Sequence, residues 1–183
     1  LSKNIKIGNI SNVMNIQIKS LELCLLLSLP ACFGLIIASE EITSALFGYG
    51  SFGEKEVVLT ARALKYFGVG VPAFALIKVL SNFLFARDNT KVPFYISAFI
   101  VFLNVLISVL YFKEIGFVII PIATSVSTWI GVVIYLILLI KFKYVNFKLS
   151  FFVNMIKIAV SSAIMAFALC YSINFFEDKL IYS

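Results

Sequence analysis

Five long apolar runs, separated by short polar segments, constrain this chain more than any other feature. The runs cover 21–38, 64–86, 93–112, 115–140 and 151–176. A helix needs about 20 mostly apolar residues to cross the hydrocarbon core of a bilayer, whereas a membrane strand needs only about 10. Each run is therefore expected to form a transmembrane helix, which satisfies its backbone hydrogen bonds internally. The predicted fold class is an all-α integral membrane protein.

The composition supports a bilayer environment. The 183 residues are 62% hydrophobic and 13% charged, which is more apolar material than a soluble domain of this size can bury in one core. The net charge of +6 is spread in small groups at the ends of the apolar runs. A nucleic-acid partner would instead require the cations to gather on one polar face, so none is expected.

The sequence also lacks the residue patterns of an enzyme. It contains no histidine and no GxSxG, HExxH or Walker motif. The three cysteines, Cys24, Cys32 and Cys170, lie singly within apolar runs, which favours packing over a metal site or a disulfide framework. No enzymatic activity, certain metal site or cofactor is predicted.

The distribution of lysine and arginine between the runs predicts the direction of the helices, because cytoplasmic loops are enriched in these residues. One set of segments carries eight cations: Lys3, Lys6, Lys19, Arg87, Lys91, Lys141, Lys143 and Lys148. The other set carries five, together with most of the acidic residues: Lys55, Arg62, Lys65, Lys113 and Lys179. We expect a cytoplasmic N-terminus and an external C-terminus, which requires an odd number of spans.

The segments outside the spans divide simply. Residues 1–20 are expected to form a cytoplasmic or interfacial lead-in, and 177–183 an external tail that stops before a last helix. The short link around Lys113–Gly116 predicts that its two flanking helices form an antiparallel hairpin. Glu54 and Glu56 suit the first turn of a helix that follows a glycine-containing turn. Because the chain starts at Leu1, without methionine or a signal pattern, we expect it to be a piece of a longer protein.

Charged residues inside the spans need a physical reason, because a charge at membrane depth costs a few kcal/mol. Lys78 lies roughly 12 Å inside its predicted span at 1.5 Å per residue. It either faces an internal cavity as a functional cation or is satisfied structurally by Asn82, one turn further on. Lys157 is close enough to the cytoplasmic interface to reach it, and Glu22 stands at the mouth of the first span.

Two neighbouring spans carry polar stripes. Ser97, Asn104 and Ser108 share one face of the third, and the fourth carries Pro121 and Thr124. Such stripes usually pack helices together. The alternative is a cation site lined by the amide of Asn104, the hydroxyls of Ser108 and Thr124, and a carbonyl freed near Pro121.

A separate set of helix-breaking residues, Gly68, Gly70 and Pro72, interrupts the second span. Such a combination predicts a kink or local unwinding, which serves either as a hinge or as a static packing feature.

Several sequence runs, in order, resemble the MurJ (MviN) family of lipid II flippases. The best match lies in 46–93 and combines LFxxGxF, TARAL (60–64), GVPAFALIKVL (70–80) and FARDNTKVP (85–93). LPACFGL (29–35), LNVLIS (103–108) and PIATSVSTW (121–129) also resemble the family. The resemblance covers roughly 19–141 and is looser in the last span.

The resemblance implies a transporter of the multidrug/oligosaccharidyl-lipid/polysaccharide exporter superfamily, with fourteen helices in two lobes. This chain would supply helices nine to thirteen, most of the C-terminal lobe, and its partners would be a lipid-linked cell-wall precursor, membrane lipids and the N-terminal lobe. The family's substrate-binding arginines lie in that other lobe, so the substrate-binding residues are unknown here.

The same resemblance also implies a sodium site, with Asn104, Thr124 and the carbonyl of Ile120 as ligands and Ser108 where an acidic ligand can occur. Sodium or the membrane potential would be the coupling force.

The sequence thus predicts part of a lipid II flippase that acts by alternating access in the bacterial inner membrane, in peptidoglycan and cell-wall biosynthesis. One alternative is an exporter of another lipid-linked oligosaccharide or of drugs. Another is an inactive membrane scaffold or a split-gene remnant.

Overall fold

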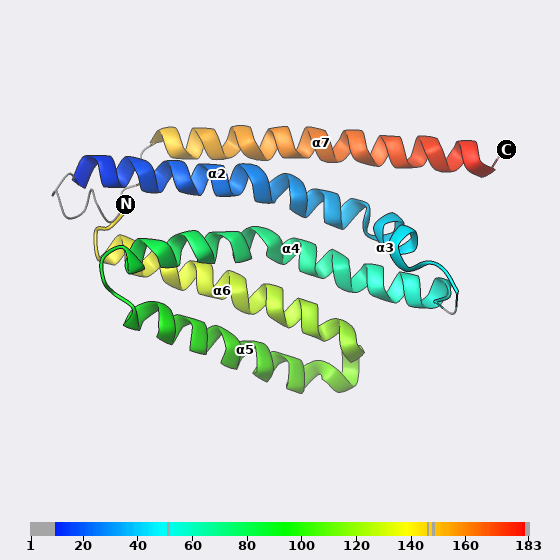
Figure 1. The fold of residues 1–183 in the computed structure, drawn as a ribbon, viewed down its shortest axis with the longest axis horizontal. Helices are drawn as coiled ribbons and strands as arrows, with labels where there is room; N and C mark the ends of the chain where they lie inside the picture. The colour runs from blue at the N-terminus through cyan, green and yellow to red at the C-terminus, as the bar shows by residue number, and fades with distance from the viewer. Residues whose placement is uncertain (1–9, 51, 146, 148, 182–183) are drawn as a thin grey trace.

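The computed structural model describes residues 10–181 apart from 51, 146 and 148, and the helices carry the labels of Figure 1. Within these residues the elements are α2 (Ile10–Ile37), α3 (Ser39–Phe47), α4 (Glu54–Phe85), α5 (Lys91–Ile115), the 3-10 turn η1 (Gly116–Val118), α6 (Ile119–Lys141) and α7 (Leu149–Ile181). No strand occurs among them. The all-α fold class is confirmed.

Four helical stretches are long and apolar enough to cross a membrane: 12–37, 54–85, 91–141 and 149–175. The third stretch has 51 residues and contains both α5 and α6, which fold back on each other at η1. Gly116 makes this reversal with a φ of 75°, in the left-handed region that glycine adopts without steric cost. The described part of the chain therefore holds five helices of membrane length, and the predicted hairpin is present.

Several helices extend beyond the apolar runs that predicted them. α2 begins at Ile10 instead of Leu21, α4 begins at Glu54 instead of Leu64, and α7 continues to Ile181. Hydropathy marks only the apolar part of a span. The helix itself continues into polar residues wherever its backbone hydrogen bonds continue. The predicted lead-in is thus helical from Ile10 onward, and the predicted tail is helical up to Ile181. Residues 1–9 and 182–183 of these two segments lie outside the described residues.

The segment between the first two spans also contains a helix that was not predicted. The nine residues of α3 carry Glu40 and Glu41 in the first turn, where acidic side chains favour the positive end of a helix. Its length is below that of a membrane span. The predicted acidic start of the next helix is confirmed, because Glu54 and Glu56 lie in the first turn of α4.

The long helices lie side by side as a layer-like bundle, in the order α7, α2, α4, α6, α5 (Figure 1). Helix α4 packs against both α2 and α6, whereas α5 packs mainly against α6. Among the described helices, α7 contacts only α2.

Successive long helices alternate in direction, so the loops collect at two ends of the bundle (Figure 1). We call them the Arg87 end, with the α4–α5 and α6–α7 loops, and the Gly116 end, with η1 and α3.

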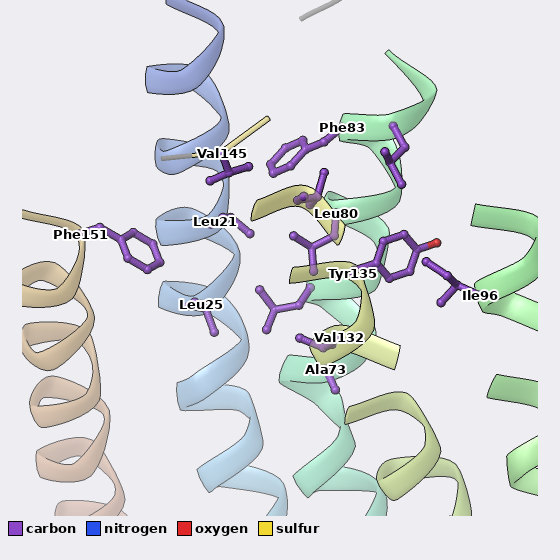
Figure 2. Close-up of a cluster of buried hydrophobic side chains, with 13 residues drawn as sticks. Leu21, Leu25, Ala73, Leu80, Phe83, Ile96, Val132, Tyr135, Val145 and Phe151 are labelled. Atoms are coloured by element: carbon purple, nitrogen blue, oxygen red, sulfur yellow. The ribbon is translucent and has the colours of Figure 1, made fainter. Parts of the chain in front are cut away.

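Buried apolar side chains from several helices form one core cluster, shown in Figure 2. Leu21 and Leu25 from α2 meet Leu80 and Phe83 from α4, and Tyr135 enters from α6. Helices in a bilayer gain little from burying apolar surface, since lipid is equally apolar, so close van der Waals packing holds them.

Glycines allow helices to approach each other closely. A Cβ atom at Gly68 would lie 3.1 Å from Leu35 Cβ of α2, and one at Gly70 would lie 2.6 Å from Ser125 Oγ of α6.

Candidate functional site

A polar contact joins α5 and α6 at membrane depth. Asn104 Nδ2 donates to Thr124 Oγ1 at 2.7 Å, and Thr124 Oγ1 donates to the Ile120 carbonyl, one turn earlier in α6, at 2.7 Å. The hairpin at Gly116 sets this register, because it places residues at similar distances before and after the turn beside each other. Three of the four predicted sodium-site residues therefore lie together.

Ser108 is the fourth predicted residue of this site, and it takes no part in the Asn104–Thr124 contact. It lies one turn after Asn104 on α5, and its buried hydroxyl has no hydrogen-bond partner among the described residues. A buried hydroxyl without a partner is unfavourable, because it has lost its bonds to water. Ser108 is thus an oxygen donor that a ligand could satisfy.

The oxygens of this cluster are neutral amide, hydroxyl and carbonyl groups. These suit a hard cation, which takes oxygen ligands. No group of three or more His, Cys, Asp or Glu that could hold a metal occurs within the described residues. The chemistry of the donor set therefore fits a weakly held monovalent cation, and a negative charge would have to come from elsewhere.

Pro121 does not create the carbonyl that its position in the predicted span suggested. The helix α6 starts at Ile119, so Pro121 lies in its first turn. The first backbone N–H groups of a helix have no partner within the helix, and a proline there removes no hydrogen bond. The Ile120 carbonyl is instead occupied by the Thr124 hydroxyl.

Lys78 and Asn82 are both exposed, on one side of α4, and no hydrogen bond joins their side chains in the described structure. The interpretation that Asn82 satisfies Lys78 gains no support. Lys78 lies seven residues before the end of this membrane-length helix, on a face that the other described helices leave open. A functional role for this cation stays a prediction.

The turn around Pro72 is held by side chains of α6. Ser125 Oγ donates to the Tyr66 carbonyl at 2.7 Å, and Trp129 Nε1 donates to the Val69 carbonyl at 3.1 Å. Proline disturbs helix bonding, and neighbouring helices in membrane proteins supply donors at such places.

Helix α4 continues through Pro72 from Glu54 to Phe85, so its backbone is not unwound there. The hinge role of Gly68, Gly70 and Pro72 stays a prediction.

Arg87 forms a cluster that the sequence did not indicate, because most of its partners are distant in sequence. Its guanidinium donates to the Phe83 carbonyl at 2.7 Å and to the Tyr144 carbonyl at 3.5 Å, and its central carbon lies 4.2 Å from the centre of the Tyr144 ring. Burial lowers the pKa of Arg87 from its ordinary value, and Tyr144 opposes this effect. An arginine nonetheless stays charged at physiological pH.

Gln17 completes this cluster from α2, where it is fully buried. With its amide oriented to satisfy both neighbours, the oxygen accepts from Arg87 Nη1 at 2.8 Å and the nitrogen donates to the Tyr144 carbonyl at 2.8 Å. The only sequence signal was a glutamine among apolar residues. The Arg87 cluster therefore connects α2, the end of α4 and the α6–α7 loop at the Arg87 end.

Comparison with known proteins adds a family relationship to this geometry. The family model described as "Lipid II flippase MurJ" matches residues 1–183. A Rhizobium tropici protein named "Probable lipid II flippase MurJ" is 32% identical over 98% of this chain and 34% of its own length. A Rickettsia prowazekii protein of the same name is 35% identical over 70% of this chain and 25% of its own length. The chain thus spans about a third or less of these relatives.

A solved structure, titled "Lipid II flippase MurJ, inward closed conformation", has the same fold. It superposes with a TM-score of 0.79 at 25% identity and covers 93% of this chain and 35% of the solved chain. Because the family model matches the whole sequence and the fold agrees, the chain belongs to the MurJ family of lipid II flippases.

Proposed function

We propose that this chain is part of a transporter that moves lipid II, a lipid-linked peptidoglycan precursor, across the bacterial inner membrane by alternating access. The observation that carries the proposal is the family match over the whole chain, supported by the likeness to a flippase solved in an inward closed conformation. The activity belongs to the whole protein, because this chain spans only about a third of its relatives. We propose a transporter and not an enzyme, since flipping breaks no covalent bond of the lipid.

Within that protein, this chain would act as a rigid lobe. Helix α4 is central and packs on both sides, and the Arg87 cluster ties three segments together at one end. A lobe that moves as one body needs such internal connections, because alternating access is largely the rocking of one bundle against another. The groups that hold the pyrophosphate of the substrate would lie in the other lobe, as the family resemblance implies.

We also propose a coupling-ion site at Asn104, Thr124 and the Ile120 carbonyl, with Ser108 nearby. The support is the 2.7 Å contact between two spans and the unsatisfied Ser108 hydroxyl. Sodium would add a positive charge that these neutral oxygens can coordinate, and this chain's residues would fix the distance between α5 and α6 around it.

Lys78 is proposed as a cation facing the space enclosed between the lobes. Its exposure on α4 supports this placement, since the described helices leave its face uncovered. A cation there would favour an anionic lipid head group in that space.

Complementation tests the function. The full gene that encodes this chain is expressed in a strain depleted of its own lipid II flippase, and growth with normal cell shape is expected. A native protein that inserts into the membrane normally but does not restore growth would contradict the proposal. Restored export of a different lipid-linked oligosaccharide or of a drug would favour the alternative exporter, and no transport of any of them would favour a scaffold or remnant.

A further inference from the structure

A pocket of about 410 Å³ opens between α2 and α7, separate from the polar contact of α5 and α6. Its lining includes two cations, Lys19 and Lys157, and one carboxylate, Glu22. The apolar side chains of Leu23 and Leu26 line it as well. The pocket therefore brings charged and apolar side chains of two helices together.

A hydrogen bond joins the two helices within the pocket lining. Asn154 Nδ2 of α7 donates to Glu22 Oε1 of α2 at 2.9 Å. This bond matters for α7, which among the described helices packs only against α2. It fixes the lateral distance between the helices and keeps the Glu22 carboxylate beside the lysines.

The two lysines reach toward the same membrane surface. Helices α2 and α7 run in the same direction from the Arg87 end (Figure 1). Side chains on a helix tilt toward its N-terminus, so both ammonium groups point toward that end. Lys157 lies eight residues after the start of α7, roughly 12 Å along the helix, and because its side chain tilts back toward that start its ammonium can reach the head-group layer.

Neither ammonium is paired within the described structure. Lys19 and Lys157 are both exposed, and neither forms a hydrogen bond or an ion pair with another described residue. The single carboxylate of the pocket already accepts a bond from Asn154. Two cations against one carboxylate leave the polar end of the pocket with a net positive charge.

The apolar part of the lining lies deeper in the membrane. Leu23 and Leu26 follow Lys19 by about one and two turns on α2, and they are 58% and 48% exposed. Ile158 continues this surface on α7. The order from the membrane surface inward is therefore cationic and then apolar, which matches the order of a phosphate and an acyl chain in a phospholipid.

From this arrangement we propose that the pocket binds a bilayer phospholipid of the leaflet at the Arg87 end. Lys19 and Lys157 hold its phosphodiester, and one acyl chain lies over Leu23 and Leu26. The recognised group is the phosphodiester shared by phosphatidylglycerol and phosphatidylethanolamine. The Glu22 carboxylate disfavours a free phosphate dianion and can accept a bond from an ethanolamine ammonium.

Lipid titration of the intact protein tests the site. The full-length protein in detergent is titrated with phosphatidylglycerol, and native mass spectrometry counts the bound lipids. The double variant Lys19→Gln/Lys157→Gln is expected to lose one bound lipid, with affinity at that site lowered about 30-fold, because each cation near a membrane surface contributes roughly a factor of five. The matched control, Lys55→Gln/Lys65→Gln, removes two exposed lysines at the Gly116 end and is expected to bind as the parent does.

Three further arms identify the ligand. Lys19→Arg/Lys157→Arg should retain the lipid, which separates loss of charge from misfolding. Diacylglycerol with the same chains should not occupy the site, and millimolar inorganic phosphate should not displace the lipid. Equal lipid retention in the glutamine variant overturns the proposal. That result is expected if another segment of the full-length protein covers the pocket. Equal binding of diacylglycerol, or displacement by phosphate, overturns it too.

Discussion

Thr124 illustrates how much one side chain contributes at membrane depth. Its hydroxyl accepts a bond from Asn104 and donates one to the Ile120 carbonyl, both at 2.7 Å. Replacing it with valine keeps the shape but removes both bonds. If the coupling-ion proposal holds, Thr124→Val and Asn104→Ala in the intact protein each lower sodium-dependent transport about tenfold, and transport is measured in vesicles with and without a sodium gradient.

The control for this experiment is Ser172→Ala on α7. Among the described residues the Ser172 hydroxyl bonds only to the Ala168 carbonyl of its own helix, so its loss is expected to leave sodium dependence unchanged. If the Thr124 and Asn104 variants keep full sodium dependence and lose only thermal stability, these residues pack α5 against α6 and do not hold an ion.

Lys78 is expected to affect transport without affecting stability. It is exposed and has no hydrogen-bonding or ionic side-chain partner among the described residues, so Lys78→Gln is expected to leave the melting temperature unchanged. The same variant should lower transport of the lipid at least about fivefold, since an attraction for an anionic group in the cavity is lost. Lys65→Gln, an exposed lysine near the start of the same helix, is the control. Unchanged transport with Lys78→Gln, or an equal loss with Lys65→Gln, contradicts the proposed role.

Individual contacts could be predicted from the sequence only where a short hairpin fixed the register. Asn104 and Thr124 lie on either side of the turn at Gly116, and the polar stripes that contain them predicted a contact between the two spans. Arg87, Gln17 and Tyr144 are far apart in sequence, and the charge of Arg87 indicated only the side of the membrane. The Glu22–Asn154 bond was equally hidden, because it joins helices separated by the rest of the bundle in sequence.

At the scale of elements, the glycines of α4 are expected to matter through packing. A Cβ at Gly70 would lie 2.6 Å from Ser125 Oγ, which is held by its bond to the Tyr66 carbonyl, and 2.9 Å from the Phe74 ring. Gly70→Ala should therefore destabilise the protein by about 1–3 kcal/mol, the usual cost of overpacking. Thermal unfolding of the protein in detergent measures the effect.

Gly34 of α2 provides the matched control. It is also inside a membrane-length helix, but a Cβ there meets nothing within 4 Å. Gly34→Ala should be neutral or slightly stabilising, because alanine favours helix more than glycine does. A Gly70→Ala variant as stable as Gly34→Ala would show that α4 and α6 can separate at this point, as a hinge requires.

The elements themselves follow from simple physical limits. The number of long helices and the α5–α6 hairpin were predictable, because a bilayer admits few alternatives for apolar runs of this length. The ends of α2 and α4 were not, because a helix that leaves the hydrocarbon core loses its hydropathy signal and keeps its backbone bonds. Helix α3 was missed for a related reason, since its nine residues mix polar and apolar side chains and form no long apolar run.

On the scale of the whole molecule, charge is sorted between the two ends of the bundle. The Arg87 end carries one acidic residue, Asp88, and the cations of two loops: Arg87, Lys91, Lys141 and Lys143. The Gly116 end carries cations and acidic residues together: Lys55, Lys113, Glu40, Glu41, Glu54, Glu56 and Glu114. Since arginine and lysine are enriched on the cytoplasmic side of membrane proteins, we infer that the Arg87 end faces the cytoplasm.

Cysteine labelling at the two ends of α5 tests this orientation within a single helix. Lys91 and Lys113 are both exposed and lie near the start and the end of α5. The native Cys24, Cys32 and Cys170 are first replaced by serine or alanine in the intact protein, and each lysine is then changed singly to cysteine. A membrane-impermeant maleimide added to intact spheroplasts should label Lys113→Cys and spare Lys91→Cys, which reacts only after the membrane is permeabilised. The reverse pattern would place the Arg87 end outside, and it would move the proposed phospholipid pocket to the outer leaflet. Labelling of both positions in intact spheroplasts would mean that α5 does not span the membrane.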